Sequence, residues 1–80
     1  MILEEERVLI KKILGHRYSK LAQQKLIKQG YFNSNKEPYS NEQIRNVMNG
    51  VPHVIIEAAI WELVTDKKAI QKQREELLRS

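Results

Sequence analysis

The stretch from Asn41 to Asn49 contains the side chains best suited to recognising a ligand. On a helix, its apolar residues share one face: Ile44, Val47 and Met48. The opposite face carries Glu42, Arg45, Asn46 and Asn49. Amide and guanidinium groups form paired hydrogen bonds with base edges, Asn with adenine and Arg with guanine. We therefore expect base contacts from these four residues and from Asn41, which lies at the side of the wheel but near the end that usually enters the major groove.

The alternative is that this face is an ordinary solvated surface, since Asn is common on surfaces. Asn is, however, a poor helix former, and this short segment holds three: Asn41, Asn46 and Asn49. Asn49 already has a structural reason, because it sits at the end of the segment. The other two favour a functional interpretation.

The boundaries of this segment are marked by local signals. Pro38 disfavours helix at the residue before it. Ser40 is a good N-cap, and Gln43 three residues later completes a capping box. Asn49 and Gly50 form a C-terminal cap pair, and Pro52 follows as a stop. The sequence thus predicts a helix of under three turns over residues 41–49.

Apolar spacing predicts three further helices, at about residues 3–14, 18–29 and 53–78. We predict an all-α chain with four helices, a single domain over residues 1–80 whose core spans about 3–64, and a helical extension over about 65–80. The connection over residues 31–39 is rich in turn formers, and Asn33 to Lys36 indicates a tight reversal. A small hairpin is the alternative to an irregular loop. Its three aromatics predict an ordered loop in which at least one of them packs on the core: Tyr31, Phe32 and Tyr39.

The net charge of +4 is distributed unevenly along the chain. Residues 7–53 carry nine Lys or Arg and only two Glu, whereas residues 54–80 carry five charges of each sign. A polyanionic partner is the simplest explanation, and a solvated basic surface is the alternative. If the partner is DNA, the candidates for phosphate contacts are Lys20, Gln24, Lys36 and His53.

The segment from Tyr39 to Gly50, followed by Ile56 to Ile60, resembles the recognition helix and following helix of lambda-repressor-like helix-turn-helix domains, the Cro and phage-repressor type of transcription regulator. The matching positions are Ser40, Ile44, Val47, Asn49, Gly50, Ile56 and Ala59. Leu21 to Gln24 is similar to the start of the first motif helix, so the resemblance covers about residues 18–64. It implies sequence-specific binding of double-stranded DNA and a role in transcription regulation of a phage or mobile element.

The chain departs from this pattern between the two motif helices. The family's turn is usually three or four residues long, but here about ten residues intervene, from Gly30 to Tyr39. The chain is therefore either a variant with an insertion or a looser relative.

The remaining residues point away from catalysis. The sequence has no cysteine, and its two histidines, His16 and His53, form no His-x-x-x-His pair, so a zinc site lacks its ligands. Glu4, Glu5 and Glu6 would point in different directions on one helix, and the glycines are isolated. We expect a cytoplasmic protein that is not an enzyme and has no metal, cofactor, small-molecule substrate or membrane association.

The last predicted helix is apolar in its first half and polar in its second. Ile56, Leu63, Ile70 and Leu77 recur every seven residues, but Lys67 and Arg74 interrupt the companion positions of a coiled coil. Trp61 is either a core aromatic or a dimer contact. We expect a homodimer through the end of this helix; the competing outcome is a monomer that frays after about Lys68. The alternative function is a helical interaction module that docks on a protein partner through this helix, with binding that changes little with salt.

Overall fold

The structure is a computed structural model that describes residues 1–79, with side chains through Leu78. In this range the chain forms four helices and no strand: α1 (Glu4–Leu14), α2 (Tyr18–Lys28), α3 (Asn41–Met48) and α4 (Val54–Arg79). The expected all-α fold with a long C-terminal helix is confirmed, and each helix boundary lies within one or two residues of its predicted position.

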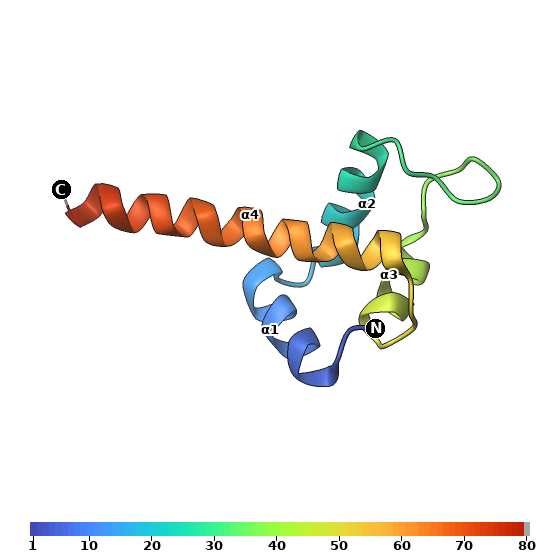
Figure 1. Cartoon of the computed structure of the whole chain (residues 1–80), viewed down its shortest axis with the longest axis horizontal. Coiled ribbons are helices and arrows are strands. Elements are labelled where there is room, and N and C mark those ends of the chain that lie inside the picture. Colours follow the sequence, from blue (N-terminus) through green and yellow to red (C-terminus); the bar gives the residue numbers. More distant parts are fainter. Residues whose placement is uncertain (80) are drawn as a thin grey trace.

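The helix α4 is the long axis around which the other three helices pack. Figure 1 shows α1, α2 and α3 grouped around the first half of α4, with the second half extending beyond them. Contacts join α2 to both α3 and α4, and α1 packs on α4. Helices α2 and α3 are thus held against each other and against α4.

The core is apolar and draws on every helix. Its largest fully buried side chains are Ile10, Leu26, Ile44, Val47, Met48, Ile56 and Ile60. Among the described residues no polar or charged side chain is buried as a whole. Each fully buried side chain of this size contributes about 1.5–3 kcal/mol relative to an exposed one, so this cluster fixes how the helices sit.

Side chains at the helix ends satisfy backbone groups that the helices leave open. The Ser40 hydroxyl accepts a hydrogen bond from the Gln43 backbone N–H (3.1 Å), which is the N-cap half of the predicted capping box. At the other end of α3, Asn49 is the C-cap and Gly50 has a φ of 111°, a left-handed conformation that favours glycine. At the start of α4, His53 Nδ1 accepts from the Ile56 backbone N–H (3.2 Å).

The connection between α2 and α3 is ordered by its own hydrogen bonds. The Asn33 side chain accepts from the backbone N–H groups of Asn35 (2.9 Å) and Glu37 (3.0 Å). Tyr39 is buried, whereas Tyr31 and Phe32 remain 47% and 43% exposed. The expectation that at least one of these aromatics packs on the core is therefore confirmed, through Tyr39 alone.

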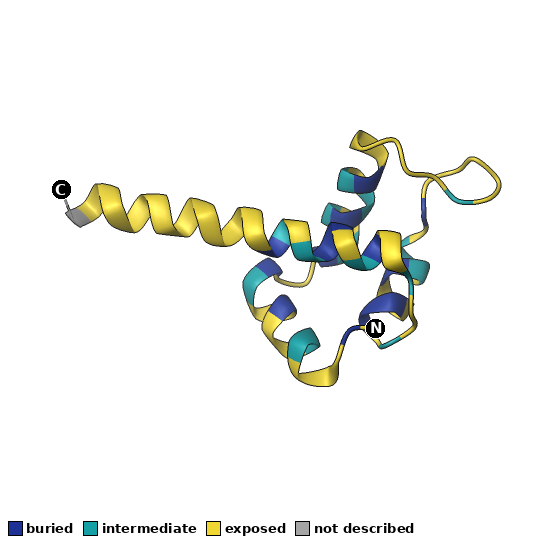
Figure 2. Cartoon of the chain, in the orientation of Figure 1, coloured by how far each residue is buried: buried dark blue, intermediate teal, exposed yellow. Residues whose placement is uncertain are grey.

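The second half of α4, residues 65–79, is called here the α4 extension. Every described side chain in it, from Thr65 to Leu78, is exposed (Figure 2). The last core residue of α4 is Val64, as the loss of apolar spacing predicts. None of the helices in the described part of the chain is long and apolar enough to span a membrane.

Candidate nucleic-acid interface

The helix α3 separates a buried face from a polar one. Ile44, Val47 and Met48 are 0–1% exposed and fix the helix in the core. The opposite side, called here the outer face of α3, is exposed as predicted and consists of Glu42, Arg45, Asn46 and Asn49. Because packing and both caps hold the helix, these side chains project from a rigid base.

Asn41 differs from the residues of this outer face. It is only half-buried, but its Oδ1 is shielded from solvent and has no hydrogen-bond partner in the protein. An unpaired buried carbonyl costs about 1–3 kcal/mol. The structure thus does not group Asn41 with the four exposed residues, and its oxygen must turn outward before it can contact a base.

On α2, Lys20 and Gln24 are exposed and lie one turn apart. Gln23, the residue before Gln24, is partly buried, and its Nε2–H donates to the Tyr39 carbonyl oxygen (2.9 Å). This bond ties α2 to the residue that precedes the Ser40 cap. Sequence reasoning did not find it, because the Gln23–Gln24 pair gives no sign of which amide faces α3.

The other two candidates for phosphate contacts lie on connections rather than on α2. Lys36 is exposed, with a φ of 60°, in the loop that projects from the helical body (Figure 1). His53 is half-buried, and its ring meets that of Tyr39 edge to face at 5.2 Å between centroids. Because His53 Nδ1 caps α4, only its Nε2 remains to meet a ligand. The four candidates therefore come from three parts of the chain: α2, the connection between α2 and α3, and the start of α4.

Arg7 is a residue of this surface that sequence reasoning missed. Its Nη1 donates to Asn49 Oδ1 (3.2 Å), which joins α1 to the outer face of α3. Burial raises the pKa of Tyr18, and the charges of Arg45 and Arg7 oppose that rise. The only sequence signal was that Arg7 opens the basic stretch.

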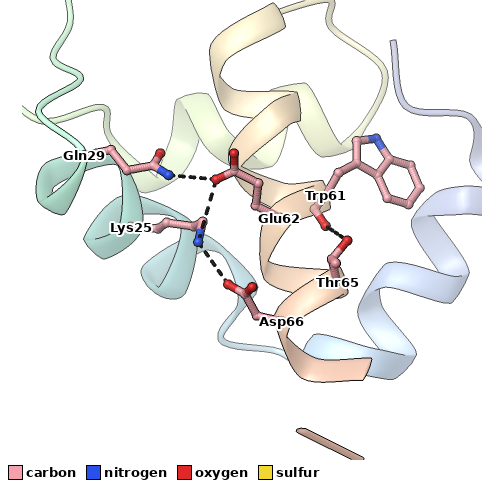
Figure 3. A network of polar contacts seen from close by, with 6 residues as sticks. All are labelled: Lys25, Gln29, Trp61, Glu62, Thr65 and Asp66. Atoms are coloured by element: carbon pink, nitrogen blue, oxygen red, sulfur yellow. Dashed lines mark hydrogen bonds and ion pairs between the residues drawn. The ribbon is translucent and has the colours of Figure 1, made fainter. Parts of the chain in front are cut away.

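At the interface between α2 and α4, in contrast, the basic side chain is paired with acidic ones. Lys25 Nζ lies 3.0 Å from Asp66 Oδ2 and 3.7 Å from Glu62 Oε2, and Gln29 donates to Glu62 (2.7 Å) (Figure 3). The charge of Lys25 is therefore neutralised by α4 and is not available to a polyanion. Trp61, across α4 in the same view, packs partly buried against the core, in line with the core-aromatic interpretation.

Other kinds of site find little support in the described residues. No group of three or more His, Asp or Glu side chains there could hold a metal ion. His16 is exposed, and His53 serves as a cap.

No protein-family model matches this chain, and neither a curated protein nor a solved structure does. Function is therefore inferred from this surface itself.

Proposed function

We propose that this chain binds double-stranded DNA in a sequence-specific manner through the outer face of α3. The observation that carries the proposal is the contrast within this eight-residue helix. One face is locked in the core and both ends are capped, while Arg45, Asn46 and Asn49 present guanidinium and amide groups to solvent. Such groups on a fixed helix suit the donor and acceptor pattern of the major groove.

The distribution of charge supports the same partner. Among the basic residues of the middle stretch, Lys25 is neutralised by the acids of α4, whereas Lys20 and Lys36 are exposed and form no ion pair in the described structure. Together with Gln24 and His53, these two residues are proposed to contact phosphates, which position a domain without reading its sequence.

The kind of regulator is part of this proposal. The resemblance of Tyr39 to Gly50 to a repressor recognition helix favours a small, single-domain transcription regulator of phage or mobile-element type. The long connection, residues 29–40, replaces the short turn of that motif. Packing between α2 and α3 and the Gln23–Tyr39 bond nevertheless hold the two helices together without a short turn.

The test is a binding-site selection from random duplex DNA, followed by affinity measurements at several salt concentrations. We expect one enriched sequence and an affinity that falls steeply with salt, with a log–log slope of about −0.9 per phosphate contact. Recovery of no common sequence, together with affinity that is independent of salt, would overturn the proposal.

A second role is favoured by the α4 extension. The Ile70 and Leu78 side chains are 53% and 88% exposed there. This part of α4 does not pack on the core, unlike the first half of the helix. Isolated helices of about 12–15 residues are marginal in water, so a partner would stabilise this one. We propose a second copy of the chain as that partner, with a protein-docking module of another kind as the alternative function.

A further inference from the structure

The hydrogen bond between Arg7 and Asn49 changes what Asn49 can offer to DNA. Recognition of adenine by Asn requires the side-chain oxygen to accept from N6 while the amide nitrogen donates to N7. In this structure, Asn49 Oδ1 already accepts from Arg7 Nη1 at 3.2 Å. This bond occupies one lone pair of Oδ1, while the N–H groups of the Asn49 amide and the other N–H groups of the Arg7 guanidinium stay free to donate to a ligand.

The charge around this pair is mixed, because acidic residues stand beside it on α1 (Glu4, Glu5 and Glu6) and on α3 (Glu42). The carboxylate nearest Arg7 belongs to Glu4, at 3.7 Å, and the Glu4 side chain is 85% exposed. An exposed pair of this kind is worth about 0–1 kcal/mol. Arg45 is exposed, forms no ion pair within the described residues and lies one helical turn before Asn49, where it adds a second positive charge. Two guanidinium groups together with the amide N–H of Asn49 supply several donors to an anion.

The position of Asn49 favours the DNA backbone over the bases. Asn49 is the C-cap of α3, whereas recognition helices usually present their N-terminal residues to the base edges. The C-terminus of a helix carries a partial negative charge, which disfavours an anion unless cations are close. Arg7 and Arg45 supply those cations.

We propose that Arg7 and Asn49 together bind a backbone phosphate of DNA, so that Asn49 positions the protein and does not read a base. The inference rests on the DNA-binding function proposed above and reassigns one residue of its interface. Arg7 donates to Asn49 and to the phosphate at once, which fixes the distance between α1, α3 and the DNA strand. Arg45 remains a base contact whose charge strengthens the phosphate site.

The first experiment compares Arg7→Gln with Lys12→Gln. Both variants remove one positive charge from α1, but Lys12 is exposed and lies five residues further on, on the side of the helix away from Arg7. We expect Arg7→Gln to weaken binding about tenfold and equally on selected and scrambled duplexes, with the salt slope smaller by about one contact. Lys12→Gln should bind as the unaltered protein does. An Arg7→Gln protein with unaltered affinity and slope, or with only a lower melting temperature, would overturn the proposal.

The second experiment repeats the binding-site selection with Asn49→Ser. We expect the same preferred sequence at lower affinity, because phosphate contacts carry no sequence information. Loss of preference at a single base pair would show that Asn49 reads a base and would overturn the proposal. Failure of the DNA-binding function itself is recognised separately, since the unaltered protein would then select no sequence and show no salt dependence; that result overturns both inferences.

Discussion

The helix α3 and the α4 extension both present polar side chains to solvent, yet their structural support differs. The helix α3 is the shortest of the four, but it buries three side chains almost completely and is capped at both ends. The α4 extension is longer and buries none of its described side chains. Packing, rather than length, decides which helix has a fixed orientation. Of these two regions, only α3 carries its exposed side chains on a backbone that is fixed before a ligand binds.

The largest expected difference between the two regions is the loss of stability when an apolar side chain is truncated to alanine. Ile44→Ala should lower the free energy of unfolding by about 2–5 kcal/mol, because Ile44 is fully buried. Ile70→Ala, the matched change in the α4 extension, should change the free energy of unfolding by less than about 0.5 kcal/mol at protein concentrations where the chain is a monomer. Urea denaturation of both variants measures this. Equal losses would show that the α4 extension packs on the core in solution.

For the exposed polar side chains of the two regions, the comparison concerns DNA binding and not stability. Arg45→Ala and Asn46→Ala should each cost about 1–3 kcal/mol of specific DNA binding while leaving the unfolding transition in place. Lys72→Ala, which alters an exposed residue of the α4 extension, is the control and should bind normally. Affinities for the selected duplex decide the matter; if Arg45→Ala and Asn46→Ala bind as the unaltered protein does, α3 is not the reading helix.

The cap of α3 gives a smaller effect. Ser40→Ala should reduce stability by about 1 kcal/mol, since the Gln43 backbone N–H loses its acceptor. Ser34→Ala, in the exposed loop, should have no measurable effect. Thermal unfolding followed by circular dichroism compares the two variants. Identical melting temperatures for both would mean that core packing alone sets the start of α3.

Truncation after Lys68 should have the smallest effect on the core. We expect the free energy of unfolding of the monomer to change by less than about 0.5 kcal/mol, because none of the removed side chains that the structure describes is buried. The same truncation should convert a dimer to a monomer in sedimentation equilibrium. A full-length chain that stays monomeric at high concentration, with and without DNA, would remove the proposed homodimer and leave DNA binding untouched.

Local features of α3 were predictable from sequence, whereas its long-range bonds were not. Pro38, Ser40 and Gly50 mark the ends of α3 through interactions that span only a few residues. The bonds from Gln23 to Tyr39 and from Arg7 to Asn49 join residues 16 and 42 positions apart. They depend on how whole helices pack, which no local pattern specifies.

The loop aromatics show the same limit. Sequence composition indicated that Tyr31, Phe32 or Tyr39 would be buried, but each has a similar apolar surface. Tyr39 is the buried residue, and it lies directly before Ser40, next to the start of α3. Tyr39 is buried because the chain joins the helical body there, and the sequence alone does not specify that point.

The turn centred on Asn33 makes the connection between α2 and α3 tolerant of changes in length. Its hydrogen bonds close the turn on itself, while Tyr39 and Gln23 anchor the chain independently where it re-enters the body. Doubling the length of a flexible loop costs only about 0.6 kcal/mol. Residues added beside Ser34 would therefore leave α3 in place. The turn is therefore the position at which the molecule can carry an epitope or a fluorescent label without displacing α3.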